Sequence, residues 1–491
     1  MAEIPFPGDT VRDEDLDPKD WPAFRAQAHA MLDDILDHVA GVRERPVWRP
    51  TPLESLQRLR AGAPREPTAL ADVHRDFLAD VAPFTVGNLH PRFMGWVHGG
   101  GTVVGLVAEM LAGGLNANLG GRNHAPVQVE RQVARWMAEL IGFPEAASGL
   151  FVTGASMANF VAVLVARRAA LGEASRRQGV AAVGERPTAY ASSAAHNCIA
   201  RAMDMAGLGS DALRLIPTDA DGRIDLAAAA ASIETDRSAG HRPFLLIGTA
   251  GSVDTGAVDD LEALADLAAR EDLYFHVDGA YGALGVMSPA LAPKFAGLSR
   301  ADSVALDFHK WGQAPYDAGF ILVRDQDRHM AAFASPAAYL SREARGLAAG
   351  SPWPCDFGPD LSRGFRALKV WFTLRVYGTR RLGRSMLRTC ELAGRLAARI
   401  DREPELERLA PVALNIVCFR YRADAKSDAM NAEIVAELQE TGDAAPSTTV
   451  LDGRLAIRAA IVNHRTTEGD VDALVDGVLA IGRRLNGGAG R

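Results

Sequence analysis

The sequence predicts an α/β fold with a mostly parallel sheet, and three observations lead to this prediction. Between about residues 86 and 375, short apolar runs alternate with Ala-rich segments of helical periodicity, which is typical of parallel strands joined by helices. The chain has 491 residues, too many for one simple core, so two or three domains are expected. A hydrophobic content of 48% is that of a globular protein.

The strands and helices of this sheet follow from the same pattern. Apolar runs predict strands at residues 149–153, 188–192, 213–216, 244–249, 274–277, 303–306 and 320–323. Helices are predicted between them, including 157–170, 225–235 and 259–270. Asp225 and Asp259 are candidates for the N-cap or the first turn of the last two helices.

Three domains are expected along the chain. Residues 1–85 form helices with Pro-rich joints, for example 21–42, and such a segment must pack its apolar face on another domain or a second subunit. Residues 86–375 form a large domain, in which about 333–360 lack periodicity and predict a mobile lid or a disordered loop. Residues 376–491 predict a small α+β domain with strands near 413–421 and 455–462.

Charge and cysteine content exclude several functions. The net charge of −8 argues against a nucleic-acid partner, because phosphate contacts need clustered basic residues. The four cysteines are scattered without CxxC spacing, so neither a metal site nor a disulfide framework is expected. The most apolar stretch, 102–115, is short and carries Glu109. We therefore expect a cytoplasmic enzyme for a small molecule, with no membrane span.

Two residues suggest a particular chemistry. Only five of the 53 basic residues are lysines, and one of them, Lys310, follows a predicted strand. A primary amine forms an imine with an aldehyde, which arginine cannot do. Asp278 follows the strand at 274–277, where a carboxylate needs a partner such as the protonated pyridine nitrogen of pyridoxal phosphate. The ordinary alternatives are a strand end in solvent for Lys310 and a helix N-cap for Asp278.

Other signals lie at the ends of neighbouring strands, where ligands bind in open α/β sheets. Residues 153–159 carry small side chains before a helix, so backbone N–H groups and the Ser156 hydroxyl could hold a phosphate. His196 could stack on a pyridine ring, Ala280 leaves room beside it, and His309 could donate to the phosphate. Each signal also has a structural explanation, but their order favours one pyridoxal phosphate site.

The chain resembles the group II PLP-dependent amino acid decarboxylases, the family of aromatic-L-amino-acid, glutamate and diaminobutyrate decarboxylases. The resemblance runs from His90-Pro91-Arg92-Phe93 through Lys310-Trp311 to residues 365–372 and Tyr377-Gly378. It implies the fold-type I architecture of PLP-dependent transferases. It also implies a homodimer interlocked by the N-terminal helical segment, with active sites at the subunit interface.

The resemblance implies roles for individual residues. Lys310 matches the lysine that forms the imine with the cofactor, Asp278 the partner of the pyridine nitrogen, and His196 the ring-stacking histidine. Tyr339, in a segment that resembles the family's mobile loop, matches the tyrosine that protonates the substrate carbon after CO2 is lost. The other assignments are the phosphate-binding positions Ala155, Ser156 and His309, and Ala280 against the ring.

The predicted reaction is decarboxylation of an L-amino acid to its amine, and an aromatic substrate (Trp, Tyr, Phe or Dopa) is favoured. Lys310-Trp311 resembles the aromatic branch, and Trp96 and His98 are the candidate substrate contacts. Residues 288–304, in contrast, resemble the glutamate and diaminobutyrate branch.

Two alternatives to an aromatic decarboxylase follow. Arg122 and His124 could bind an acidic side chain, which would make glutamate, aspartate or diaminobutyrate the substrate class. The chain could also be an aromatic aldehyde synthase, although the presence of both His196 and Tyr339 speaks against it. The sequence departs from the family at Gly251-Ser252-Val253, where relatives have Gly-Thr-Thr and hence a hydroxyl near the cofactor.

Overall fold

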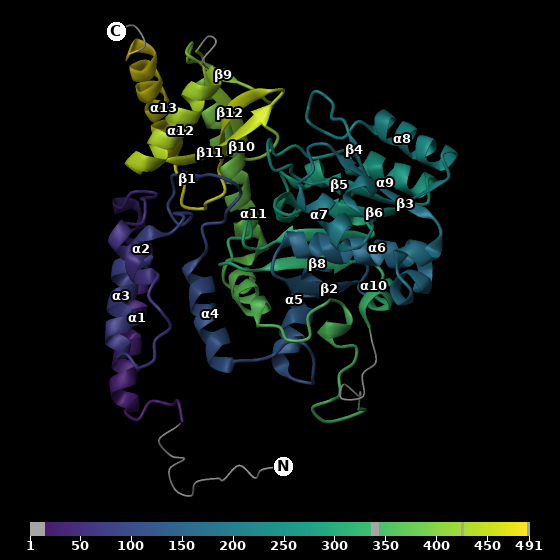
Figure 1. Cartoon of the computed structure of the whole chain (residues 1–491), viewed down its shortest axis with the longest axis horizontal. Helices are drawn as coiled ribbons and strands as arrows, with labels where there is room; N and C mark the ends of the chain where they lie inside the picture. Colours follow the sequence, from purple (N-terminus) through teal and green to yellow (C-terminus); the bar gives the residue numbers. More distant parts are fainter. Residues whose placement is uncertain (1–14, 335–342, 424–426, 489–491) are drawn as a thin grey trace, which may run out of the picture. The chain divides into compact units, whose positions relative to one another are not determined.

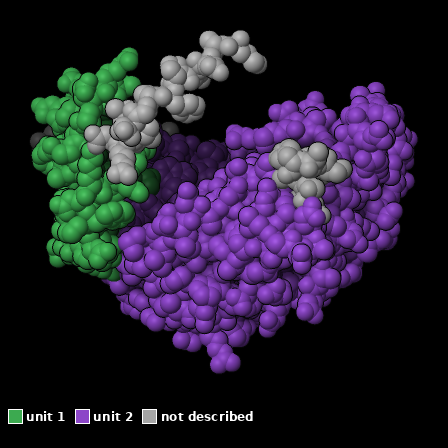
Figure 2. All heavy atoms as spheres, turned by 90° about the horizontal axis from the view of Figure 1, so that it is seen from below, with its two compact units in different colours: residues 1–45, 49–86 green, residues 46–48, 87–491 purple. Residues whose placement is uncertain are grey.

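A computed structural model describes residues 15–334, 343–423 and 427–488 of the protein. The chain forms two compact units, shown in different colours in Figure 2. Unit 1 comprises residues 1–45 and 49–86, and unit 2 comprises residues 46–48 and 87–491.

Unit 1 is helical, as predicted. It contains α1 (Trp21–Ala40), α2 (Leu53–Leu59) and α3 (Leu70–Asp80), with 3-10 turns at Val42–Glu44 and Ala82–Phe84. Asp20 caps α1, because its side chain accepts a hydrogen bond from the Ala23 backbone N–H. Within this unit several large apolar side chains remain exposed, among them Trp21, Phe24, Leu53, Val73 and Phe77.

A seven-stranded sheet forms the centre of unit 2, and all seven predicted strands are confirmed (Figure 1). The strand order is β2-β8-β7-β6-β5-β3-β4, and only β8 runs antiparallel to its neighbours. The strands are β2 (Ser148–Val152), β3 (Arg186–Ser192), β4 (Leu213–Ile216), β5 (His241–Thr249), β6 (Tyr274–Asp278), β7 (Ser303–Asp307) and β8 (Gly319–Val323). The inner strands are buried along almost their whole length, as expected for a sheet covered on both faces.

Helices pack on this sheet or on one another, and some of them connect its strands. They are α4 (Val103–Leu115), α5 (Ala125–Ile141), α6 (Ala155–Arg177), α7 (Cys198–Met205), α8 (Leu226–Ser238), α9 (Leu261–Arg270), α10 (Gln326–Phe333) and α11 (Arg366–Ile400). Among the described helices, α6 alone is long and apolar enough to cross a membrane by length and composition. Half of its apolar window is buried against the rest of the protein, which is the environment of a core helix.

One of the two predicted helix caps is correct and the other is wrong. Asp225 caps α8, accepting hydrogen bonds from the Ala227 and Ala228 N–H groups. Helix α9 is instead capped by Asp260. Asp259 points inward and accepts hydrogen bonds from the Ile224 and Thr249 N–H groups, at 2.8 and 2.7 Å. Burial raises the pKa of Asp259 to about 6. Its two hydrogen bonds join the end of β5 to the segment before α8, so Asp259 does not cap a helix.

A second sheet in unit 2 brings distant segments together. Its strand order is β1-β11-β12-β10-β9. The strands are β1 (Phe93–Met94), β9 (Leu406–Arg408), β10 (Ile416–Tyr421), β11 (Ala445–Leu451) and β12 (Arg454–Ala460), with α12 (Ser427–Thr441) and α13 (Glu468–Gly488) beside them. Strand β1 pairs in parallel with β11, so the loop that follows β1 is anchored far from its sequence neighbours. The predicted boundary at residue 375 lies within α11 and stays a prediction.

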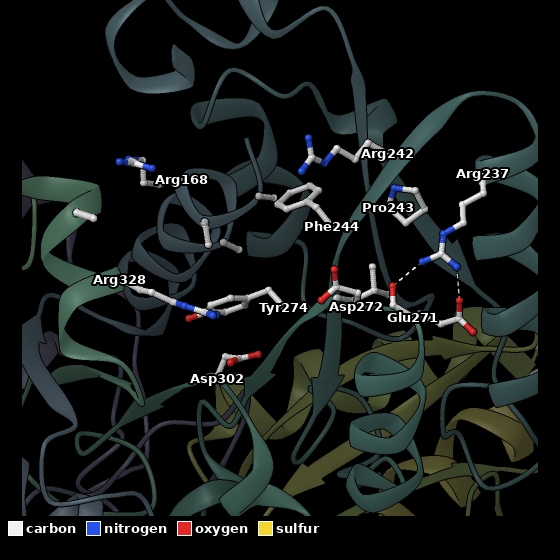
Figure 3. A pocket seen from close by; sticks show the side chains of 15 residues that line it. Arg168, Arg237, Arg242, Pro243, Phe244, Glu271, Asp272, Tyr274, Asp302 and Arg328 are labelled. Carbon is white, nitrogen blue, oxygen red and sulfur yellow. Dashed lines mark hydrogen bonds and ion pairs between the residues drawn. The ribbon is translucent and has the colours of Figure 1, made fainter. Parts of the chain in front are cut away.

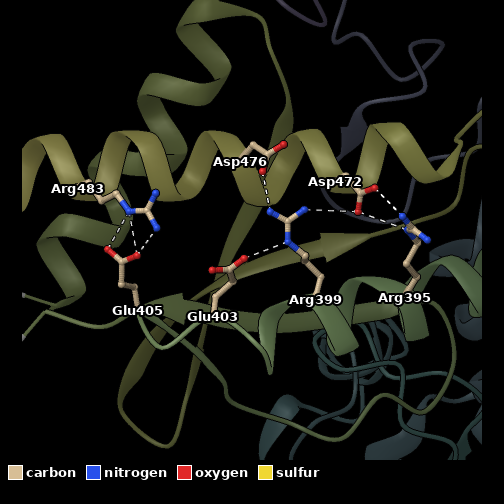
Figure 4. Close-up of polar contacts among 7 residues, drawn as sticks. All are labelled: Arg395, Arg399, Glu403, Glu405, Asp472, Asp476 and Arg483. Carbon is tan, nitrogen blue, oxygen red and sulfur yellow. Dashed lines mark hydrogen bonds and ion pairs between the residues drawn. The ribbon is translucent and has the colours of Figure 1, made fainter.

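Ion pairs connect α11 and the following turn to α13 (Figure 4). Arg395 pairs with Asp472 and Arg399 with Asp476, each at 2.8 Å. Arg483 pairs with Glu405 at 2.5 Å. These side chains are partly to largely exposed, so solvent screens the pairs and each contributes little to stability.

A buried arginine has a larger role in folding. Arg363 is 1% exposed and pairs at 2.6 Å with Glu130, which is 3% exposed. It also donates to the backbone oxygens of Leu119 and Phe151, at 2.9 and 2.7 Å. Arg363 therefore joins α5, β2 and the loop after α4.

We expect Arg363→Ala to destabilise unit 2 by about 3–5 kcal/mol, because the Glu130 carboxylate would stay buried without a cation. Urea unfolding followed by tryptophan fluorescence would measure this loss. Arg395→Ala, which removes an exposed pair, is the matched control and should leave the urea midpoint almost unchanged. Equal losses in the two variants would contradict the prediction.

Candidate active site

The carboxyl ends of β2, β3, β5, β6 and β7 meet around a cavity of about 230 Å³. Eight of the predicted site residues line it: Trp96, His98, Ala155, Ser156, His196, Asp278, Ala280 and Lys310. His309 does not line the cavity but is buried behind it, with its Nε2 atom 3.6 Å from an oxygen of Asp307. Tyr339 lies outside the described residues. The structure therefore brings predicted residues of five separate segments to one place.

Asp278 is held by a chain of hydrogen bonds. Its two oxygens accept from the Ala280 N–H and the Asn159 Nδ2 atom, each at 3.1 Å. The Asn159 side chain is fixed in turn by His276, whose Nε2–H donates to the Asn159 Oδ1 atom at 2.7 Å. His276 Nδ1 accepts from the Ser303 hydroxyl at 2.8 Å, and burial lowers the pKa of His276 to about 3, so the ring is neutral. This arrangement fixes the direction in which the Asp278 carboxylate points.

Burial also affects the charge of Asp278. It raises the pKa of the Asp278 carboxyl, and the nearby Lys310 ammonium opposes this effect. A buried carboxylate of this kind gains from a cationic partner in the cavity. The protonated pyridine nitrogen of pyridoxal phosphate is such a partner.

Lys310 reaches the same cavity from the turn after β7. Its Nζ atom lies 2.9 Å from the Asp307 carboxylate, and Asp307 also accepts a hydrogen bond from the Ala155 N–H at 2.7 Å. His309 is oriented by the Ala318 N–H, which donates to its Nδ1 atom at 3.0 Å, so the proton of the neutral ring is on Nε2. Ala155, Lys310 and His309 therefore surround the carboxylate of Asp307.

His196 and Ser156 lie at the open side of the cavity. His196 Nδ1 accepts a hydrogen bond from the Cys198 N–H at 3.1 Å, which leaves its proton on Nε2. Partial burial lowers the pKa of His196, so a neutral ring is available for stacking. Ser156 is exposed in the first turn of α6, where backbone N–H groups favour an anion such as phosphate.

An aromatic wall forms another side of the cavity. Trp96 stacks on His98, with ring centroids 5.8 Å apart, and His98 meets Tyr316 edge-on at 5.7 Å. Trp96 adopts a left-handed backbone conformation with φ of 46°, which is uncommon for a bulky residue and occurs at strained functional loops. Its side chain is 52% exposed. Burial, together with the Lys310 charge, lowers the pKa of His98, so this wall is uncharged.

Unpartnered polar groups around the cavity are a further reason to expect a bound ligand such as pyridoxal phosphate. Two buried hydroxyl groups that line it, Thr249 Oγ1 and Tyr281 Oη, have no hydrogen-bond partner among the described residues. Such groups are costly unless a ligand or water satisfies them. Lys310 supplies the amine, Asp278 the carboxylate for a pyridinium nitrogen, and the start of α6 the donors for a phosphate.

A larger pocket of about 590 Å³ lies at the opposite edge of the sheet, where β5 and β6 begin (Figure 3). It contains none of the predicted site residues. Its arginines are largely paired, Arg237 with Glu271 and Arg242 with Glu185. Within residues 15–334, 343–423 and 427–488, no group of three or more His, Cys, Asp or Glu side chains could hold a metal ion.

Sequence reasoning missed several residues that build the site. Asn159 was overlooked, although a fully buried amide on an apolar helix one turn after Ser156 is a usable signal. Asp307 was overlooked as well, although an acid at the end of an apolar strand, three residues before Lys310, needs a partner. Besides Asp307, the lining residues that the sequence analysis gave no role are Val97, Cys198, Thr249 and Tyr281.

Comparisons with known proteins agree with this chemistry. Residues 52–422 match the family described as the pyridoxal-dependent decarboxylase conserved domain. The chain is 32% identical over 473 residues to an aromatic-L-amino-acid decarboxylase of Bacillus atrophaeus, which covers 94% of this chain and 96% of the relative. It is also 32% identical over 422 residues to an L-2,4-diaminobutyrate decarboxylase of Rhizobium meliloti, covering 85% and 82%.

Solved structures show the same fold. The crystal structure of Oryza sativa TDC with PLP and tryptamine superposes with a TM-score of 0.87, at 24% identity, covering 96% of this chain and all of that one. The fold is therefore that of the PLP-dependent decarboxylases, as expected. The chain belongs to the pyridoxal-dependent decarboxylase family, and it is a PLP-dependent carboxy-lyase that acts on an amino acid.

Proposed function

We propose that the protein decarboxylates an aromatic L-amino acid (Trp, Tyr, Phe or Dopa) to the corresponding amine and CO2. The observation that carries this proposal is the aromatic wall of Trp96 and His98, which lines the same cavity as Lys310. Stacked, uncharged rings favour the side chain of an aromatic substrate through dispersion and edge contacts.

Each residue of the site has a definite task in this proposal. When bound, pyridoxal phosphate supplies an electron sink for the bond that breaks as CO2 leaves. Lys310 provides the amine that binds the cofactor, and Asp278 keeps a proton on the pyridine nitrogen. His196 stacks on the ring and donates from Nε2 to the substrate carboxylate. Ala155, Ser156 and His309 hold the phosphate, Ala280 lies against the ring, and Tyr339 returns a proton to the substrate carbon.

A diaminobutyrate or acidic substrate is the second candidate, supported by the relative from Rhizobium meliloti. The residues expected to bind an acidic side chain do not line the cavity: the Arg122 guanidinium lies over the Trp353 ring at 4.4 Å, and His124 Nε2 contacts the Gly121 oxygen at 3.1 Å. Among the described residues that line the cavity, Lys310 is the one Lys or Arg, and it is assigned to the cofactor. These contacts favour the aromatic candidate.

A substrate panel tests the proposal. The purified protein with pyridoxal phosphate would be incubated with Trp, Tyr, Phe, Dopa, Glu, Asp and diaminobutyrate while amine, aldehyde and peroxide are measured together. Amine from the aromatic members without peroxide is expected. Amine only from Glu, Asp or diaminobutyrate would replace the proposal by its second candidate. Aldehyde and peroxide in equal amounts would identify an aldehyde synthase.

The role of Tyr339 can be tested separately. We expect Tyr339→Phe to bind the cofactor normally but to lower amine formation by about 10²–10⁴-fold, the usual contribution of a general acid. A larger share of aldehyde and peroxide should accompany this loss. Tyr316→Phe, in the described aromatic wall, is the control and should leave the product ratio unchanged. Unchanged amine yield in Tyr339→Phe would contradict the role.

We also propose a cytoplasmic homodimer. The exposed apolar side chains on α1, α2 and α3 support this, because they need a protein surface to cover them. The four cysteines, all of which lie within the described residues, form no disulfide, which is compatible with a reducing compartment. Light scattering after size exclusion should give twice the chain mass of 52.3 kDa. A concentration-independent mass of one chain would contradict the dimer.

A further inference from the structure

The Asp307 carboxylate lies beside three groups at one end of the cavity: the Ala155 N–H, the Lys310 amine and the His309 ring. One of its oxygens accepts the Ala155 N–H at 2.7 Å, and the other lies 2.9 Å from Lys310 Nζ and 3.6 Å from His309 Nε2. Its side chain is only 3% exposed. A carboxylate this deeply buried is stabilised by its cationic partner, and the cation is stabilised in return.

The consequence for Lys310 follows from two opposing effects. Burial is the largest single effect and lowers the pKa of Lys310, but the Asp307 carboxylate, which is in direct contact, opposes it together with more distant groups, so the pKa of Lys310 is raised above its ordinary value. An ammonium has no lone pair and cannot attack an aldehyde. At neutral pH, the pair with Asp307 therefore opposes the reaction for which the lysine is needed.

The other ionisable groups near Lys310 do not cancel the effect of Asp307 on its protonation. Asp278 on β6 also favours the ammonium, and so does the Cys198 thiol at the start of α7. His98 and His196 face the lysine from two other segments, and His309 directly precedes it; burial lowers the pKa of each, so all three are neutral at neutral pH. Asp307 is the closest of these groups and the one in direct contact with the Nζ atom.

We propose that Asp307 is a positioning residue that keeps Lys310 as an ammonium in the cofactor-free protein and thereby slows the capture of pyridoxal phosphate. The proposal rests on Lys310 being the amine that binds the cofactor, as proposed above. In the capture step, the neutral Lys310 Nζ bonds to the aldehyde carbon, and the carbonyl oxygen leaves as water with the two amine protons. The extra proton of the ammonium passes to solvent beforehand in a rapid equilibrium, so the fraction of Lys310 in the neutral form sets the rate of capture.

The experiment compares cofactor-free wild type with Asp307→Asn, which keeps an oxygen to accept the Ala155 N–H. Capture of pyridoxal would be followed by absorbance from neutral to alkaline pH, because pyridoxal lacks the phosphate and its rate reports on the amine alone. Borohydride reduction and peptide mapping would locate the modified lysine. Removing the carboxylate should lower the pKa of the amine by about one unit and speed capture at neutral pH by about tenfold.

A control variant shows whether a change in the rate of capture is specific to Asp307. Glu109→Gln removes the carboxylate that pairs at 2.8 Å with another lysine, Lys369, and should leave capture unchanged. Equal or slower pyridoxal capture in Asp307→Asn would overturn the proposal, as would an effect seen only with pyridoxal phosphate, since Asp307 would then act on the phosphate. If Asp307→Asn does not fold, the wild-type profile decides: half-maximal capture at or above the ordinary lysine pKa supports the proposal, and a lower midpoint overturns it.

The same experiment distinguishes a failure of the Asp307 proposal from a failure of the role assigned to Lys310. Modification of a lysine other than Lys310 would contradict its assigned role, whatever the rates. Normal labelling of Lys310 with no effect of Asp307→Asn would overturn only the present proposal and leave the decarboxylase assignment unchanged.

Discussion

Lys310→Ala is expected to lower amine formation at least about a thousandfold, because no other described lysine reaches the cavity to bind the cofactor aldehyde covalently. The variant should also lose the visible absorbance band of bound cofactor. Both effects can be measured on the same preparation, by amine assay and by a spectrum recorded after dialysis against pyridoxal phosphate.

Lys294→Ala is a suitable control, because Lys294 is exposed and lines a different surface pocket. It should retain wild-type activity and the full absorbance band. Amine formation by Lys310→Ala within tenfold of wild type would show that another group performs the role given to Lys310. Unfolding temperatures of both variants would separate loss of chemistry from loss of fold.

Asp278→Asn should give the second largest effect. The neutral amide cannot hold a proton on the pyridine nitrogen, and breaking a buried ion pair costs about 3–5 kcal/mol. This corresponds to a loss of roughly two to four powers of ten, shared between cofactor affinity and turnover. Fluorescence titration with pyridoxal phosphate would give the affinity, and the amine assay would give kcat.

The control for Asp278→Asn is Asp236→Asn, because Asp236 is another buried carboxylate that pairs with Arg214 at 2.9 Å and does not line the cavity. It should lower stability without changing cofactor affinity. Asp278→Glu should restore part of the affinity, since it keeps the charge. Equal cofactor affinity in wild type and Asp278→Asn would exclude the pyridinium contact.

The strands were predictable because each is a short, buried apolar run between polar turns. Their spatial order was not, since β8 enters between β2 and β7 through pairings that the sequence does not encode locally. The pair Asp259 and Asp260 illustrates the same limit on a smaller scale. Both residues suit a helix N-cap, and only the position of the Ile224 and Thr249 N–H groups decides that Asp259 turns inward.

The reactive residues of the site were predictable because their chemistry is rare. An imine needs a primary amine, and a buried carboxylate after an apolar strand needs a cation, so Lys310 and Asp278 could be selected from their types and places alone. Their supporting residues carry no such signal. Asn159 is an ordinary helical amide until its contacts with His276 and Asp278 are known.

The sequence by itself therefore determined the α/β class and the strands, and it selected a lysine, an aspartate and a histidine that the structure places around one cavity, because local periodicity and side-chain chemistry depend on few neighbours. Only the tertiary structure decided that the loop after β1, anchored beside β11, carries Trp96 and His98 to Lys310. It alone placed Asp307 between the lysine and the start of α6. Such contacts join residues far apart in the chain, and the packing of the whole fold sets their distances.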